Sequence, residues 1–425
     1  MPGQTTQRKP HLDELDRLRI ITALSVVAVH ALAFTSPFDH TSLALLTQNG
    51  FITAFHFTRE VFMFVTALAL VYVYGGRPLD TRRFWRRRAV GVLLPYAAWS
   101  LIYQVATNHA TNALDFLKTL AFNLVTGSAS YQLYYILLTI EFYLLLPWFL
   151  AWLPRLARHP WVTLGSSFAL EVVILFALHD VLPKAPLPGP VIENIALFFD
   201  RFAPAYQLYF VMGGLAALNL ERFRAFLLRH GAWMVVVGAL GLAILEGHYL
   251  VDTLARHIAP GAAISVLQPA MAPYSLGAIA FLYWATLWAT ERARKRDAQR
   301  TRRVWSALSD TAFGVYLVHA LILTAVMDDV APHLASWPVV ASVTLVWVLT
   351  AGASVGVTLI LLRIPVVSRL MGRERPAPEW LRTRLRLMTG TARNMIAARL
   401  PARSAKAWEV TRQRKGVAGE SDQSA

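Results

Sequence analysis

Long apolar segments separated by short polar and basic loops dominate this sequence. Crossing a bilayer as a helix takes about 20 predominantly apolar residues. Ten windows meet that requirement, and they span residues 18–35, 51–74, 89–106, 131–153, 161–179, 202–220, 232–250, 268–290, 311–327 and 338–362. The pattern therefore predicts an all-α, polytopic membrane bundle of about ten transmembrane helices.

Two of these windows depart from a long, uninterrupted apolar helix. The sixth contains Pro204 and Gly213–Gly214, and the ninth is short. Neighbouring helices or water can satisfy backbone groups released by such interruptions, so both windows are still expected to span. Aromatic residues gather at predicted helix ends, as at Tyr131, Tyr134 and Tyr135, where an interfacial belt is expected.

The basic residues alternate between the loops. If the N-terminus is cytosolic, all but five of the 41 Lys and Arg residues fall in cytosolic segments. The five exceptions are Arg59, Lys118, Lys184, Arg201 and Arg256. Because short cytosolic loops are enriched in Lys and Arg, this division predicts that both termini are cytosolic and that the number of helices is even.

These features divide the chain into three parts. Residues 1–14 are expected to form a polar cytosolic tail, residues 15–365 the transmembrane domain, and residues 366–425 a basic, partly disordered cytosolic tail. Within the last part, residues 379–400 are suited to a basic amphipathic helix on the anionic inner leaflet.

Composition supports the membrane assignment and excludes several functions. The chain is 56% hydrophobic and 16% charged, whereas soluble domains carry about 25% charged residues. The net charge of +16 would suit nucleic acid, but its placement in alternate loops is a topology signal, so no nucleic-acid partner is expected. There is no cysteine, no HExxH motif and no Walker or dinucleotide loop, so neither a metal nor a permanently bound cofactor is expected.

Ionisable residues inside predicted spans are candidates for function, because burying them in a membrane is costly. Arg19 and His30 in the first helix are eleven residues apart, which is about three turns and roughly 16 Å along the axis. Both side chains then lie on one face, with a cation at the cytosolic mouth and an imidazole deeper in the membrane. This arrangement suits entry of an anionic donor from the cytosol. The alternative is a topology anchor and a packing histidine.

Other candidates lie in later windows. Arg59 and Glu60 open the second one and belong either to a site or to the interface. Glu141 lies within an apolar run of the fourth, so we expect it in the site or as the partner of an internal base. Tyr316 and His319 share one helical face in the ninth, and a structural role is as reasonable as a functional one.

The loop before the third helix is rich in arginine. RPLDTRRFWRRRAV includes Arg83, Arg86, Arg87 and Arg88. Because arginine pairs with phosphate through two hydrogen bonds and stays charged, this loop is suited to a phosphorylated cytosolic donor. Binding of lipid headgroups is the alternative explanation.

Several stretches, in this order, resemble the membrane-bound acyltransferase-3 family. They are LDRLRIITALSVVAVHA, REVFMFVTALAL, FWRRRAVGVLLPYAAWSLIY, GSASYQLYYILLTIEFYLLLPWF, FVMGGLAAL and LSDTAFGVYLVHALIL. The resemblance covers about residues 15–365, and residues 128–149 resemble the branch without an appended extracellular domain. It departs from the family pattern at Thr66–Ala67, at Gly91 and Val92 before Pro95, at Gln132, and at Thr139 and Ile140 beside Glu141.

The resemblance implies transfer of an acyl group, often acetyl from acetyl-CoA, to a sugar hydroxyl of a bacterial envelope polysaccharide or related glycan. It implies that His30 is the catalytic base and that Arg19 matches the family's first-helix arginine. Arg83 to Arg88 match the cytosolic basic motif that serves the donor, and Tyr316 and His319 match a late helix motif. The expected location is the bacterial inner membrane, with membrane lipids and a glycan or lipid-linked sugar as partners.

Two other functions remain open from the sequence. A transporter or flippase for a lipid-linked glycan or small metabolite would have a similar composition, although the chain lacks the internal repeat typical of many transporters. A non-catalytic sensor or scaffold would tolerate loss of His30. In the enzyme hypothesis, Glu141 orients His30 or binds the acceptor.

Overall fold

A computed structural model describes residues 9–35, 42–107, 112–182, 198–296 and 299–373. Every regular element in these ranges is helical, as the sequence predicts. They belong to one compact unit, Met1–Arg373. Most of the predicted C-terminal tail, including the amphipathic helix at 379–400, lies outside the described residues.

Eight helical segments of the described chain are long and apolar enough to cross a membrane. They are α1 (Asp13–Phe34), α2 with α3 (Ser42–Ala54 and Thr58–Tyr74), α4 with α5 (Thr81–Arg88 and Leu94–Ala106), α7 (Tyr134–Leu156), α8 (Pro160–Phe176) with its extension to Val181, α12 (Gly231–Leu250) with its extension to Ala255, α16 (Ala312–Asp329) and α17 (Val339–Leu361). The protein is therefore a multi-pass membrane protein.

The other two predicted spans correspond to α10 (Gln207–Leu218) and α14 (Met271–Lys295). α10 is only 12 residues long because the chain ahead of it forms short 3₁₀ turns at Phe199–Arg201 and Ala203–Tyr206. α14 has sufficient length, with 25 residues, but it is less apolar than the eight. The sequence therefore located all ten apolar segments, and eight of them satisfy both length and composition.

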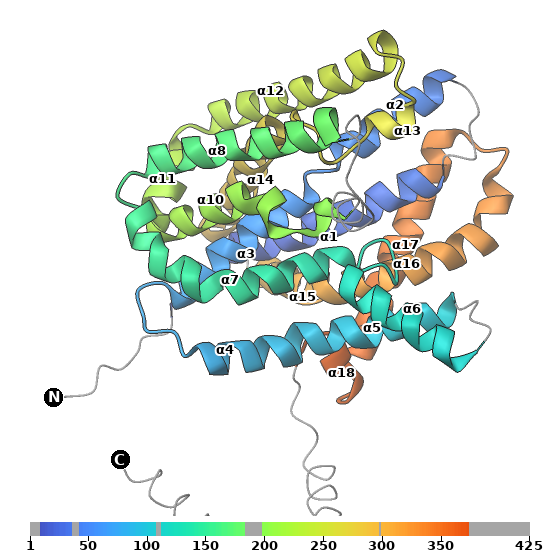
Figure 1. Ribbon diagram of the computed structural model, residues 1–425, viewed down its shortest axis with the longest axis horizontal. Coiled ribbons are helices and arrows are strands. Elements are labelled where there is room, and N and C mark those ends of the chain that lie inside the picture. Colours follow the sequence, from blue (N-terminus) through green and yellow to red (C-terminus); the bar gives the residue numbers. More distant parts are fainter. Residues whose placement is uncertain (1–8, 36–41, 108–111, 183–197, 297–298, 374–425) are drawn as a thin grey trace, which may run out of the picture. The chain divides into compact units, whose positions relative to one another are not determined.

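Shorter helices connect these segments. They are α6 (Ala113–Thr126), α11 (Leu220–Arg229), α13 (Pro260–Ala263), α15 (Gln299–Ser309) and α18 (Val367–Leu370). In Figure 1, α4, α5 and α6 follow one another along the lower edge, whereas α12 lies along the upper edge.

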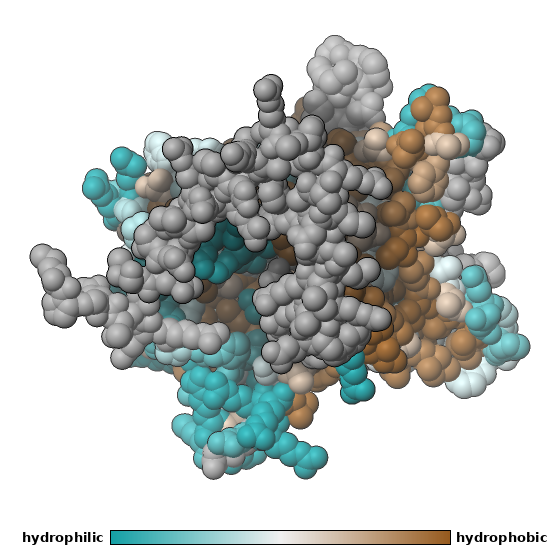
Figure 2. Space-filling view, turned by 90° about the horizontal axis from the view of Figure 1, so that it is seen from below, coloured by the Kyte–Doolittle hydropathy of each residue, from teal (hydrophilic) through white to brown (hydrophobic). Residues whose placement is uncertain are grey.

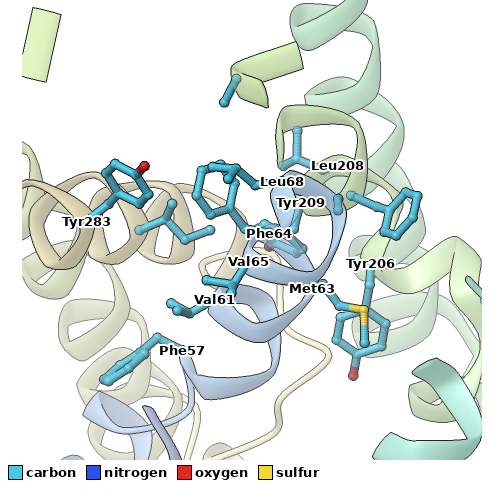
Figure 3. Close-up of a cluster of buried hydrophobic side chains, with 14 of the residues drawn as sticks. Phe57, Val61, Met63, Phe64, Val65, Leu68, Tyr206, Leu208, Tyr209 and Tyr283 are labelled. Carbon is cyan, nitrogen blue, oxygen red and sulfur yellow. The ribbon is translucent and has the colours of Figure 1, made fainter. Parts of the chain in front are cut away.

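α3 lies in the core of the described unit, where it packs against α10, α14 and α1 (Figure 1). Figure 3 shows its side chains meeting those of α10 and α14, with Phe64 and Leu68 close to Tyr209 and Tyr283. The backbones of α3 and α10 approach so closely that a Cβ at Gly213 would lie 2.3 Å from the Phe64 carbonyl oxygen. Glycine at this position therefore allows α10 to reach α3.

Two interruptions shape the helices that carry candidate residues. The second predicted span is broken by a turn at residues 55–57, which separates α2 from α3. The segment from α4 to α5 contains a π-helical turn at Ala89–Leu93. Pro95 follows this π turn and has no N–H that could donate back to it. The π-helical hydrogen bonds therefore end there, and α5 continues with α-helical ones.

The exterior carries many large apolar side chains. Trp148, Trp152 and Trp161 are each more than half exposed, and so are several valines and leucines of α8, α12 and α17. Figure 2 shows a broad hydrophobic area beside separate hydrophilic ones. A soluble monomer rarely exposes so much contiguous apolar surface, whereas lipid-facing helices are expected to do so.

Ion pairs join the N-terminal end of α1 to three other helices. Asp13 pairs with Arg302 of α15 at 2.9 Å and with Arg294 of α14 at 3.4 Å. Glu14 pairs with Arg224 of α11 at 3.5 Å. Burial alone would lower the pKa of Arg224, but Glu14 and neighbouring glutamates raise it overall. Three of the segments that the charge pattern assigns to the cytosol thus meet at one end of the molecule.

Candidate active site

Two neighbouring cavities are lined by five of the candidate site residues predicted from the sequence: His30, Arg59, Tyr316, Arg19 and Arg88. The inner cavity has a volume of about 110 Å³. Its lining comprises Val26, Val29, His30, His56, Thr58, Arg59, Phe62, Tyr131, Gln132, Tyr134, Tyr135, Val266 and Tyr316. α1, α3, the turn before α7 and α16 therefore bring together chemistry from distant parts of the sequence.

His30 sits between two aromatic neighbours. Its ring is stacked against that of His319, with centroids 5.4 Å apart and planes inclined by 21°. The Tyr131 ring lies closer, with a centroid separation of 4.3 Å. No described side chain hydrogen-bonds the His30 imidazole. Packing therefore sets its orientation, and its nitrogens are available to a bound molecule.

His319 is fully buried and has a defined hydrogen-bonding role. Its Nδ1 lies 2.8 Å from the Tyr316 carbonyl oxygen and 3.2 Å from that of Val315. Because carbonyl oxygens only accept, Nδ1 carries the hydrogen, and Nε2 of the neutral ring bears a lone pair. Nε2 has no partner among the described residues. A second imidazole able to accept a proton therefore lies next to His30.

Arg59 and Glu60 are buried in the bundle, with 8% and 2% of their surface exposed. The Arg59 Nη1 donates to the Tyr134 hydroxyl at 3.2 Å. Its Nη2 lies 3.7 Å from the Glu60 carboxylate, and the guanidinium is 5.8 Å from the Tyr206 ring centre. Arg59 reaches the inner cavity, whereas Glu60 does not line it.

A larger cavity of about 520 Å³ adjoins the inner one. Its charged lining residues are Arg19, Arg88, Asp310 and Arg373. Asp310 and Arg373 form an ion pair. The carboxylate nearest to Arg19, that of Asp16, is 4.0 Å away. The excess of cations makes this cavity suitable for an anionic ligand.

Three aromatic side chains separate the two cavities. Phe62, Tyr135 and Tyr316 line both of them. The Tyr135 ring lies 5.8 Å from Phe62 and 6.0 Å from Tyr316, measured between centroids. The Tyr316 hydroxyl donates to the Gln132 carbonyl, which fixes its position. A ligand that extends from the basic cavity toward His30 must pass these rings, which we call the aromatic partition.

The arginines predicted to bind the donor take different positions on α4. Arg88 lines the larger cavity, where its guanidinium lies 4.8 Å from the Tyr143 ring centre. Arg83, Arg86 and Arg87 are exposed and line neither cavity. The structure therefore groups Arg19 and Arg88 at the cavity and leaves the other three on the surface.

Glu141, predicted from sequence as a catalytic partner, lies elsewhere. Its carboxylate accepts a hydrogen bond from the backbone N–H of Ala203 at 2.8 Å. It lines neither cavity and makes no contact with His30. Glu141 is half-buried, and at the 3₁₀ turn before α10 its carboxylate pairs an amide that would otherwise lack a helical partner.

The sequence did not single out several residues that the structure places at the site. Tyr131, Tyr134 and Tyr135 were expected at the membrane interface but line the inner cavity. Gln132, which the sequence marked only as a departure from the family pattern, lines this cavity as well. Only the dense run of aromatic and polar residues before α7 could have indicated these positions, and that signal is equally typical of an interface.

A further group of potential metal ligands lines neither of these two cavities. Atoms of His11, Asp13 and Asp16 lie within 4.8 Å of one another. The Asp13 carboxylate is paired with Arg294 and Arg302, and Asp16 accepts from Ser309 at 3.1 Å. Because arginines and a hydroxyl already engage these oxygens, we assign the group to the ion-pair network.

Apolar helices surrounding a histidine-lined cavity, with a basic cavity beside it, define a multi-pass membrane protein with an internal site. The chain belongs to the acyltransferase-3 family, because the model of that family, described as an acyltransferase domain, matches residues 12–363. The match confirms the family inferred from the motifs and makes the protein a membrane acyltransferase. Comparisons with curated proteins and with solved structures give no match.

Proposed function

We propose that this protein transfers an acetyl group from acetyl-CoA to a sugar hydroxyl of an envelope polysaccharide or related glycan in the bacterial inner membrane. The observation that carries the proposal is the position of His30. It lines a small cavity that shares the aromatic partition with a larger cavity containing Arg19 and Arg88. Family membership favours this enzyme over a transporter or scaffold.

The donor enters from the cytosolic side in this proposal. Arg19 and Arg88 bind its phosphates, since guanidinium groups match phosphate geometry and remain charged. The thioester then extends past the aromatic partition into the inner cavity. Positioning the thioester beside the acceptor accounts for a large part of the rate enhancement, because it replaces a bimolecular encounter.

His30 acts as the general base. Its imidazole takes the proton from the acceptor hydroxyl while the oxygen attacks the thioester carbonyl. The tetrahedral intermediate then collapses, the carbon–sulfur bond breaks, and the thiolate takes the proton back from His30. A histidine is neutral over much of the physiological pH range and therefore suits both transfers.

The test uses purified protein, labelled acetyl-CoA and a glycan acceptor, with wild type compared with His30→Ala and His159→Ala. Loss of a general base is expected to lower kcat by about 10²–10⁴-fold in His30→Ala. His159 is exposed at the start of α8 and lines neither cavity, so its variant is expected to retain activity. Full activity of His30→Ala would rule out its role as base. Lack of transfer and of thioester hydrolysis by wild type would argue against the enzyme itself.

A further inference from the structure

Three of the residues that line the inner cavity each carry a buried polar atom that has no hydrogen-bond partner among the described residues. These atoms are Nη2 of Arg59, Nδ1 of His56 and Nε2 of Gln132. A buried polar group left unpaired costs about 1–3 kcal/mol, so several such groups around one cavity indicate a polar ligand. Because a guanidinium can only donate, the ligand must present an acceptor atom near Arg59.

The protein partners of Arg59 leave most of its donors unused. A guanidinium has five N–H donors, and Arg59 uses Nη1 for the Tyr134 hydroxyl. The Glu60 carboxylate is 3.7 Å from Nη2, which is too long for a hydrogen bond. Glu60 thus balances the charge at a distance, and Nη2 has no hydrogen-bond partner among the described residues.

The size of the cavity places that ligand close to His30 as well. Arg59 and His30 line the same volume of about 110 Å³. A polar ligand held in this one small cavity therefore lies near both side chains. A carbonyl group attacked beside His30 would therefore present its oxygen to the donors that border the cavity.

We propose that Arg59 binds the oxyanion of the tetrahedral intermediate, which makes it a catalytic residue; this inference rests on the proposed function. As the acceptor oxygen bonds to the carbonyl carbon, His30 takes the hydroxyl proton and the carbonyl π pair moves onto oxygen. Nη2 of Arg59 donates to the resulting oxyanion. When the π bond forms again, the carbon–sulfur bond breaks and the thiolate takes the proton from His30. A preorganised donor in a dry site is typically the largest contribution to acyl transfer of this kind.

Arg201 offers a matched control, because it is a second arginine that contacts Tyr134. Its guanidinium lies 5.6 Å from the Tyr134 ring centre and pairs with Asp200 at 3.7 Å. It already donates to Ser128 Oγ at 2.7 Å and to the Thr126 carbonyl, and it does not line the inner cavity. Arg59→Met and Arg201→Met therefore remove similar charges, one beside the cavity and one outside it.

The experiment measures kcat and KM for acetyl-CoA and acceptor in wild type, Arg59→Met, Arg59→Lys and Arg201→Met. Removing one oxyanion donor is expected to lower kcat by about 10²–10³-fold in Arg59→Met, with both KM values unchanged and Arg201→Met near wild type. An unchanged kcat with a raised acceptor KM would overturn the inference, because Arg59 would then bind the acceptor. Equal losses in both Met variants would also overturn it.

Arg59→Lys provides a readout that a purely structural role would not change. A buried ammonium loses its proton at much lower pH than a guanidinium. The Lys variant should therefore retain part of the activity at low pH and lose it as pH rises, a decline that wild type lacks. If Arg59→Met fails to insert, an Arg59→Lys pH profile parallel to wild type overturns the inference. Inactive wild type would instead contradict the proposed function itself.

Discussion

Each histidine of the stacked pair has a different chemical environment. His319 donates from Nδ1 to the Tyr316 carbonyl, whereas the His30 ring is held by packing against His319 and Tyr131. The sequence located both histidines, because charged or polar residues within apolar windows are conspicuous. It could not show that they meet, since their contact depends on how α1 packs against α16.

In the proposed mechanism, stacking against His30 gives His319 a supporting role that can be measured. We expect His319→Phe to preserve a flat ring against His30 and to lower kcat by about tenfold or less, since the base remains. In His30→Phe, kcat should fall by about 10²–10⁴-fold, because the base is lost. Steady-state acetyl transfer by both variants measures the difference. The reverse order of severity would transfer the role of base to His319.

Arg88 and Arg86 lie on the same short helix but face different surroundings. Arg88 lines the basic cavity, and Arg86 is exposed outside it. Arg88→Ala is therefore expected to raise KM for acetyl-CoA by about tenfold or more, because an arginine–phosphate contact is lost, with a smaller effect on kcat. Arg86→Ala should leave KM near wild type. Equal increases would mean that the whole basic helix attracts the donor by its charge alone.

At the scale of elements, the apolar windows predicted where helices lie because hydrophobic length is a local property of the sequence. Interruptions within them were harder to predict. The turn at residues 55–57 and the π turn at Ala89–Leu93 fall inside windows that read as continuous helices. Residues 55–57 include no proline or glycine that would mark the first, and Pro95 marks where the π turn ends but not the wider register before it.

The aromatic partition makes a prediction about the size of the acyl group. Phe62 on α3 separates the basic cavity from the inner one, which has about 110 Å³. Phe62→Ala should enlarge the passage and raise transfer of butyryl relative to acetyl several-fold. The measurement is competition between the two CoA thioesters. Leu144→Ala, on the exposed face of α7, is the control. A ratio of butyryl to acetyl transfer that Phe62→Ala leaves unchanged would contradict a role of the partition in selectivity.

The contact between α3 and α10 predicts an asymmetry between two helical glycines. A Cβ at Gly213 would meet the Phe64 carbonyl oxygen at 2.3 Å, whereas a Cβ at Gly352 of α17 would meet no atom within 4 Å. Gly213→Ala should therefore lose about 1–3 kcal/mol of stability through overpacking. Gly352→Ala should be neutral or gain up to about 1 kcal/mol. Thermal unfolding in detergent compares them, and equal stability would exclude the close packing.

At the scale of the whole molecule, the charge pattern and the ion pairs both group the same segments of the chain together. The positive-inside rule assigns the start of α1, α11 and α15 to one side of the membrane. Asp13 and Glu14 join that start to Arg224, Arg294 and Arg302 through ion pairs. The sequence could predict that these segments lie together because loop charges are read locally, whereas their cytosolic side stays a prediction.

Because the chain has no cysteine, single cysteines report sidedness without background. Arg86 lies in a segment assigned to the cytosol, and Lys118 on α6 lies in one assigned outside; both are exposed. A membrane-impermeant thiol reagent should label Lys118→Cys in intact cells and Arg86→Cys only after permeabilisation. Labelling in the opposite order would reverse the topology and place the basic cavity outside.

Transfer across a sealed membrane tests the central claim most directly. Proteoliposomes containing wild type or His30→Ala would receive labelled acetyl-CoA on the side of the membrane where Arg86 lies. A glycan acceptor would be present on the opposite side, where Lys118 lies. Wild type is expected to label the acceptor. Labelling by His30→Ala is expected to be about 10²–10⁴-fold lower, although the variant remains inserted. Equal labelling by both proteins, or none by wild type, would contradict acyl transfer through His30.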